Sequence, residues 1–157
     1  MPISVGFSVN KESLKVIGNE AKEITKDTLT IRDESGAIAI AGIIGGANTA
    51  VSDSTKSIAI EAAFFSPESL MNKARQYGLS TDASTRFERG VDPSIQAFAL
   101  ERYLDLLEEI ASFKLIGCNK LEKKTNFAKK INLDYLNFES FAGVKISKKF
   151  ITRTLKL

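Results

Sequence analysis

The first part of the chain consists of short apolar runs separated by turn signals, a pattern typical of closely spaced β-strands. Residues 3–9 alternate between apolar and small or polar side chains, which predicts a strand with one buried face. Short strands are also expected at residues 14–17 and 28–32. The nearly uncharged runs at residues 37–44 and 57–65 predict strands buried on both faces. Together they indicate a sheet-rich barrel or sandwich.

Helical spacing replaces the strand pattern after residue 65. Ser66 and Pro67 have the character of an N-cap and a first-turn proline, and Gly78 follows the segment they open, so one helix is predicted between them. Asp92 and Pro93 repeat this start for a longer helix that reaches about residue 112. Its apolar positions recur every three or four residues and predict a stripe packed in the core. The stripe consists of Ile95, Phe98, Ala99, Tyr103, Leu106, Leu107 and Ile110.

The C-terminal part predicts a separate helical unit. Residues 113–116 are expected to form one more short strand. Asp134 and Gly143 are expected to bracket a helix, and Ser147 to cap another that runs to the chain end. Because the chain ends inside a helical pattern, we expect one domain at residues 1–122 and the incomplete start of a helical domain at residues 123–157.

The distribution of charge agrees with such a boundary. The chain of 157 residues has a net charge of +3, but residues 1–113 carry 11 basic and 16 acidic side chains, whereas residues 114–157 carry 11 and 3. A basic tail of this kind can contact phosphates. Four of its lysines (Lys123, Lys124, Lys129 and Lys130) are equally well explained as solvated side chains, since no stacking set of aromatic residues is interleaved with them.

Composition excludes several kinds of site. The sequence contains no histidine, which removes Ser–His and Cys–His catalysis and histidine-ligated metals. The single Cys118 cannot form an internal disulfide or a cysteine cluster for zinc. No apolar run approaches the roughly 18–20 residues that cross a bilayer, so we expect no membrane association. Chemistry must therefore use carboxylates, hydroxyls, lysines, backbone amides or the substrate itself, and no metal ligand or catalytic side chain is assigned.

Three segments are candidates for a site. The glycines after residue 41 would let backbone amides approach a ligand, although a tight turn or bulge in the sheet is the favoured explanation of that pattern. Glu61 lies in an apolar run, where its carboxylate must face a wet cavity, find donors or have its pKa raised; on a one-sided sheet it would simply be solvated. Residues 79–93 are rich in hydroxyls that cap helices, and Arg86 and Arg89 can pair with nearby carboxylates or bind a phosphate.

Two long motifs lie in register between residues 42 and 93. EAAFFSP occupies residues 61–67, and TDAS at residues 81–84 is followed by RFERGVDP at residues 86–93. This arrangement resembles the central editing module of the bacterial phenylalanyl-tRNA synthetase beta subunit, and the resemblance extends from Ile3 to the C-terminus. It implies an α+β fold: a sheet-rich, barrel-like editing domain with two to three helices, followed by the truncated start of a small helical domain.

The resemblance also implies the site and its chemistry. The family's module hydrolyses tyrosine attached by mistake to tRNA(Phe). Glu61 matches the acceptor of the tyrosine hydroxyl, Gly42 and Gly45 match glycines that line the pocket, and Thr81 and Ala83 match residues that bound it. A positioned water attacks the ester, which fits a chain without histidine. Arg86 and Arg89 are candidates for holding the acceptor end of the tRNA.

The implied partners are tRNA(Phe), the synthetase alpha subunit and the remainder of the beta subunit, in the cytoplasm. ATP and magnesium are implied for the whole enzyme and no cofactor for this segment. The family's pocket histidine would lie upstream of position 1. Ala41 and Ala47 depart from the family's usual glycine and acidic residue. The alternative function is a non-catalytic RNA-binding or scaffold module of barrel type, because related barrel domains occur in a tRNA-modifying enzyme.

Overall fold

The computed structural model describes residues 2–9, 11–121 and 130–155. It divides into two compact units, Met1–Ile116 and Gly117–Leu157. The domain boundary predicted between residues 122 and 123 lies outside the described residues, as do Lys123, Lys124 and Lys129. Of the helices in the described ranges, none is long and apolar enough to cross a membrane.

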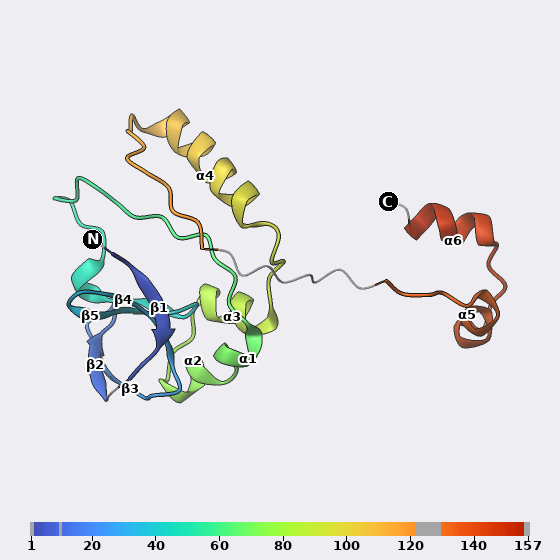
Figure 1. Ribbon diagram of the computed structural model, residues 1–157, viewed down its shortest axis with the longest axis horizontal. Coiled ribbons are helices and arrows are strands. Elements are labelled where there is room, and N and C mark those ends of the chain that lie inside the picture. Colours follow the sequence, from blue (N-terminus) through green and yellow to red (C-terminus); the bar gives the residue numbers. More distant parts are fainter. Residues whose placement is uncertain (1, 10, 122–129, 156–157) are drawn as a thin grey trace. The chain divides into compact units, whose positions relative to one another are not determined.

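Antiparallel strands form the first half of the larger unit. They are β1 (Ser4–Phe7), β2 (Glu12–Lys15), β3 (Ala21–Ile24), β4 (Leu29–Asp33), β5 (Gly36–Ile40) and β6 (Ile44–Gly45). One sheet has the order β1-β4-β5-β6, and β2 pairs with β3 in a second. An isolated bridge between Val16 and Gly46 connects the two sheets at one point. The α+β class is therefore confirmed, while the described strands do not close into the expected barrel (Figure 1).

Helices follow the strands. They are the 3-10 helix η1 (Ala47–Thr49) and the α-helices α1 (Pro67–Leu70), α2 (Lys73–Gln76), α3 (Asp82–Arg89), α4 (Gln96–Ile110), α5 (Tyr135–Ala142) and α6 (Lys148–Leu155). In Figure 1, α1, α2 and α3 lie beside the strands of the larger unit. The smaller unit contains α5 and α6. Both start as predicted: Asp134 accepts a hydrogen bond from the Leu136 amide, and Ser147 accepts one from the Phe150 amide.

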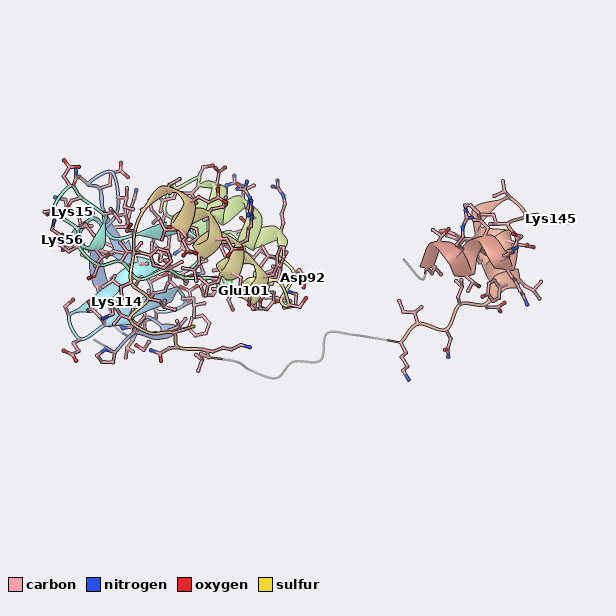
Figure 2. The ribbon with its side chains drawn as sticks, turned by 90° about the horizontal axis from the view of Figure 1, so that it is seen from above. Lys15, Lys56, Asp92, Glu101, Lys114 and Lys145 are labelled. Carbon is pink, nitrogen blue, oxygen red and sulfur yellow. The ribbon has the colours of Figure 1, made fainter. Side chains whose placement is uncertain are left out.

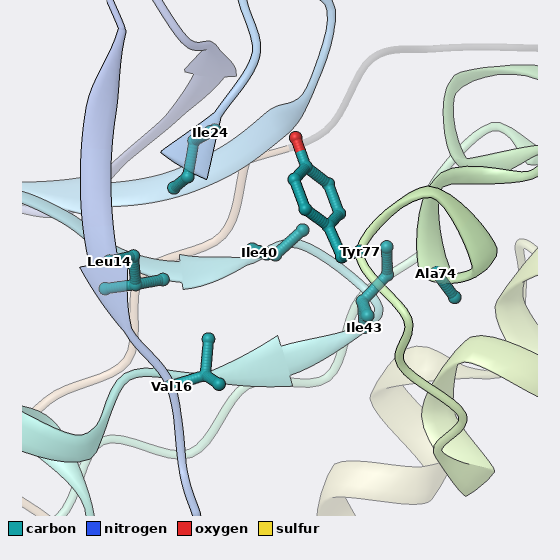
Figure 3. Packing of buried hydrophobic residues seen from close by; sticks show 7 residues of the cluster. All are labelled: Leu14, Val16, Ile24, Ile40, Ile43, Ala74 and Tyr77. Carbon is teal, nitrogen blue, oxygen red and sulfur yellow. The ribbon is translucent and has the colours of Figure 1, made fainter. Parts of the chain in front are cut away.

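The main core lies where the strands meet α2 (Figure 3). It consists of Leu14, Val16, Ile24, Ile40, Ile43, Ala74 and Tyr77. The Tyr77 hydroxyl lies 2.5 Å from the Thr28 hydroxyl and accepts a hydrogen bond from the Thr25 amide at 3.0 Å. Burial of aliphatic side chains and a satisfied phenol therefore fix α2 against the sheet.

A second core cluster joins β4 and the turn after β5 to α1. It consists of Ile31, Ala41, Phe65 and Leu70, with Phe87 packed against it. The rings of Phe65 and Phe87 lie 5.3 Å apart between centroids and are tilted by 59°. Because Phe87 belongs to α3, this cluster holds α3 next to the sheet.

Several predicted strands are corrected by the structure. The run at residues 37–44 is divided into β5 and β6 by a turn at Ala41–Ile43, where the Ile43 amide donates to the Ile40 carbonyl. The run at 57–65 is extended but forms no strand, and the same is true of residues 113–116. On β1 the expected buried face is exposed, since Val5 and Phe7 are 47% and 53% exposed. Burial needs a second surface. Within the run 57–65, Phe65 packs in the second core cluster, whereas Ile58 and Ile60 are 50% and 38% exposed.

The helix predictions also need correction. Asn72 has a φ of 62°, and this left-handed residue splits the expected helix into α1 and α2. Residues 82–89 form α3, a helix that the sequence pattern does not predict. The long helix begins at Gln96 and not at Pro93, because Asp92 accepts hydrogen bonds from the amide and hydroxyl of Ser94 in a local turn. The apolar stripe of α4 is not core: no residue of α4 is buried.

Candidate functional site

Glu61 lines an open cleft in the larger unit. The cleft has a volume of about 290 Å³ and lies between the extended segment 60–63, the end of α3 and one side of α4. Its walls are Ile60, Glu61, Ala62, Ala63, Phe87, Val91, Ile95, Gln96, Ala99, Leu100 and Tyr103. Polar groups are few among them: the Glu61 carboxylate, the Gln96 amide and the Tyr103 phenol. The cleft is thus an apolar trough with one ionisable acid.

The environment of Glu61 disfavours its charged form. Glu61 is exposed to solvent, but the surrounding protein partly desolvates its carboxyl group and raises the pKa of Glu61 above its usual value. A poorly hydrated carboxylate gains more from a hydrogen-bond donor than a fully solvated one does. Residue 61 is in no strand, so neither the two-sided nor the one-sided sheet considered for Glu61 is formed. Its side chain is exposed to solvent, as the second explanation expects, and it lines a cleft, as the first expects.

Gly42 lies at the turn between β5 and β6. Its φ is +66°, in the left-handed region that favours glycine. A Cβ at this position would lie 2.8 Å from Leu70 Cδ1, 3.1 Å from Phe65 Cδ2 and 3.3 Å from Phe87 Cβ. Glycine is therefore required both by conformation and by space. Because Phe87 also lines the cleft, the Gly42 turn lies directly behind one wall of it.

Thr81 connects α3 to the same turn. Its hydroxyl donates to the Ile43 carbonyl at 2.7 Å and accepts from the Ser84 amide at 2.9 Å. The Ser84 hydroxyl in turn accepts from the Thr81 amide at 3.0 Å, which completes a capping box at the start of α3. One side chain thus caps the helix and holds its first turn against the Gly42–Ile43 backbone.

The remaining predicted site residues are placed less centrally. Ala83 is half-buried in the first turn of α3. A Cβ on Gly45 would contact Ile17, on the side of the bridge between the two sheets. Arg86 is exposed, donates to the Asp82 carbonyl and lies 3.6 Å from its carboxylate. Arg89 is exposed at the end of α3. Of the predicted site residues, Glu61 alone lines the cleft. Gly42 and Thr81 meet at the turn next to Phe87, and Gly45, Ala83, Arg86 and Arg89 do not line the cleft.

Of the eleven residues that line the cleft, only Glu61 is predicted as a site residue, and the others include Phe87, Gln96 and Tyr103. Phe87 was only part of a motif, and Gln96 and Tyr103 lay inside or beside a stripe assigned to the core. Gln96 donates to the Asp92 carbonyl at 2.8 Å and reaches the Ala63 carbonyl at 3.5 Å, so it joins α4 to the Glu61 segment. A polar residue at the first position of an apolar helix was the available signal. In the described ranges, no group of three or more acidic or cysteine side chains is placed to hold a metal.

Comparisons with known proteins identify the family of this chain. The B3/4 domain family matches residues 1–112. The phenylalanine–tRNA ligase beta subunit of Francisella tularensis is 38% identical over 156 residues, which are 98% of this chain and 20% of that subunit. The beta subunit of Methylococcus capsulatus is 51% identical over 100 residues, 64% of this chain and 13% of that subunit. The subunit of Idiomarina loihiensis is 49% identical over 105 residues, 67% and 13% of the two chains. The chain thus spans a fifth or less of these relatives.

Proposed function

Because the chain belongs to the B3/4 domain family, and its relatives are phenylalanine–tRNA ligase beta subunits, we propose that it contributes the proofreading site of such a ligase. In this function it hydrolyses tyrosine attached by mistake to tRNA(Phe). The observation that supports the proposal is the Glu61 carboxylate, which lines an apolar cleft and has a raised pKa.

The physical basis is discrimination between two similar amino acids, tyrosine and phenylalanine. Tyrosine differs from phenylalanine by one hydroxyl, which donates a hydrogen bond to a carboxylate at Glu61. Phenylalanine in the same cleft would leave the partly desolvated carboxylate with water as its only donor, so the site favours the amino acid that carries the hydroxyl. The apolar walls, including Phe87, accommodate the ring of either amino acid.

Hydrolysis itself needs little from the side chains. A water oxygen attacks the ester carbonyl carbon, the bond from that carbon to the terminal ribose oxygen breaks, and the water's second proton passes to the released ribose oxygen. The products are free tyrosine and uncharged tRNA. We assign the chain an orienting role: Thr81 fixes the Gly42–Ile43 turn, and Ala83 leaves room for the substrate. Orientation of this kind can supply much of a rate enhancement.

The wider setting follows from the same proposal. The partners would be tRNA(Phe), a synthetase alpha subunit and the rest of a beta subunit, in the cytoplasm. ATP and magnesium would serve the aminoacylation reaction elsewhere in that assembly. Arg86 and Arg89, exposed on α3, are proposed to contact the acceptor end of the tRNA, where guanidinium groups bind phosphate in a bidentate manner.

The proposal is tested by exchanging the matching segment. This chain replaces the aligned part of the Francisella tularensis beta subunit, with which it shares 38% identity, and the assembly with the alpha subunit is assayed for Tyr-tRNA(Phe) deacylation. We expect Glu61→Ala to slow deacylation roughly 5- to 150-fold, because one hydrogen bond to a poorly hydrated carboxylate is lost. Phenylalanine charging by the same assembly should be unchanged.

The matched control is Glu101→Gln, which changes a carboxylate on α4 outside the cleft (Figure 2). Deacylation should continue at the parental rate in this variant. A Glu61→Ala variant that deacylates Tyr-tRNA(Phe) as fast as the parent would contradict the proposal. Loss of charging together with deacylation would indicate a folding defect and would require Glu61→Gln, which keeps the size of the side chain.

A further inference from the structure

The smaller unit carries a cationic surface that the proofreading site does not use. Its last helix, α6, contains Lys148, Lys149 and Arg153 and no acidic residue. At 3.6 residues per turn these three cations lie within about 140° of the helix circumference. Ile151, only 5% exposed, lies outside this arc, about 60° beyond Lys148, and anchors the helix. Lys145, in the turn before α6, adds a fourth positive charge (Figure 2).

Aromatic rings lie next to these cations. The Lys148 ammonium lies 4.8 Å from the centre of the Tyr135 ring, and the Arg153 guanidinium lies 6.0 Å from the centre of the Phe150 ring. Phe150 is 53% exposed although it is a large apolar side chain. An exposed ring beside cations is a combination that binds single-stranded nucleic acid, since a base stacks on the ring and phosphates meet the charges.

The acidic groups of the unit do not cancel this surface. Among the described residues of the smaller unit they are Asp134 and Glu139, both on the α5 side. They line the same hollow as Lys148. Asp134 is engaged in capping α5, where it accepts hydrogen bonds from the Leu136 amide and from Asn137 Nδ2. Lys149 and Arg153 are outside that hollow and stay exposed.

We propose that α6 is an RNA-contact surface, on which Lys148, Lys149 and Arg153 bind phosphates of an unpaired RNA segment and Phe150 stacks on one of its bases. The choice of RNA as the partner rests on the proposed function. The surface is separate in sequence from Lys123, Lys124 and Lys129, which lie outside the described residues.

The test is binding of the full chain to an uncharged tRNA(Phe) transcript, measured by fluorescence anisotropy across a salt series. Each phosphate contact adds roughly 0.7 to the slope of log affinity against log salt for single strands. We expect the triple variant Lys148→Gln/Lys149→Gln/Arg153→Gln to lower that slope by about two units. The single variant Lys149→Gln should lower it by roughly 0.7 and serves if the triple variant does not fold.

The matched control neutralises three exposed lysines of the larger unit, Lys15, Lys26 and Lys56. It should leave the slope within a few tenths of the parental value, and an equal decrease would show a general charge effect and overturn the proposal. Phe150→Leu, which keeps an apolar side chain, should weaken binding about five-fold or more through lost stacking. It should not alter binding to a fully paired RNA hairpin of equal length.

An unchanged slope in the triple and single α6 variants would overturn the cationic part of the proposal, and parental binding by Phe150→Leu would overturn the stacking part. Binding of uncharged tRNA does not depend on ester hydrolysis. A normal result here together with a failed Glu61→Ala experiment would therefore reject the proofreading function alone.

Discussion

Apolar residues have opposite surroundings in two regions of the larger unit. Around the strands and α2, Ile40 and Ile43 are 1% and 3% exposed. On the extended segment and α4, Ile58 and Ile110 are 50% and 82% exposed. Both regions have the apolar pattern of a core element, but only the first has a second layer packed against it. Periodicity therefore reports which face of an element is apolar, and the packing partner decides whether that face is buried.

The contrast predicts a large difference between two isoleucine substitutions. Ile40→Ala should lower the free energy of unfolding by about 2–5 kcal/mol, because it removes buried methyl groups and leaves a cavity. Ile110→Ala should change it by less than about 0.5 kcal/mol. Urea unfolding followed by circular dichroism measures both. Equal losses in the two variants would show that α4 is packed as firmly as β5.

The second comparison concerns two left-handed glycines of the same unit. Gly42 and Gly78 have φ values of +66° and +64°, but an added Cβ meets Leu70 at 2.8 Å only at Gly42, and nothing within 4 Å at Gly78. Gly78→Ala should therefore cost about 1–2 kcal/mol of stability through backbone strain alone. Gly42→Ala should cost about 1–3 kcal/mol more through overpacking. The difference in urea midpoint measures the steric contribution, and identical midpoints would contradict it.

Much of this architecture was predictable from local signals. Asp134, Gly143 and Ser147 mark the ends of α5 and α6 because caps act within a few residues of the chain. The α+β class followed from the change in spacing after residue 65. The strand β3 was missed because its sequence, AKEI, has only one strongly apolar position facing the core. The exposed stripe of α4 was mistaken for core because partners distant in sequence leave no local trace.

The candidate site was predictable to a smaller extent. The residues of the motifs converge on one region, since Thr81 contacts the Gly42–Ile43 turn and Phe87 lies between that turn and the Glu61 cleft. Gln96 and Tyr103 were not expected there. Tyr103 belongs, with Ile95 and Ala99, to the apolar stripe that the spacing predicts, but this stripe lines the cleft and is not buried in the core.

A polar contact within the well-packed region gives a smaller effect. Tyr77→Phe removes the hydroxyl that bonds Thr28 and Thr25 and leaves the buried Thr28 hydroxyl with fewer partners. We expect a loss of about 1–2 kcal/mol in the free energy of unfolding. Combining it with Thr28→Val should cost less than the sum of the two single changes, because the pair acts together. Additive losses would show that the hydroxyls do not interact. Tyr103→Phe, on the partly exposed face of α4, is the matched control and should be neutral.

The smallest expected effect is a pH dependence of the free energy of unfolding, whose sign differs between Glu12 and Glu61. The hydrogen bond and charge of Arg32 hold the pKa of Glu12 below its usual value, whereas desolvation raises the pKa of Glu61. For Glu12 the unfolded chain binds protons first as the pH falls, so its contribution to stability is present above pH ~4.3 and decreases as the pH falls through the folded pKa.

For Glu61 the folded chain binds the proton first, so its contribution is present below pH ~4.3 and is lost as the pH rises through the folded pKa. Relative to the parent, Glu12→Gln should therefore destabilise the chain most at neutral pH, and Glu61→Gln should stabilise it there. Each difference should be below about 1 kcal/mol, because both side chains retain contact with water. Urea midpoints measured between pH 3 and pH 7 decide the sign. Changes in the same direction for both variants would show that a charged partner lowers the pKa of Glu61. The cleft would then not be a partly desolvated site for a hydroxyl donor.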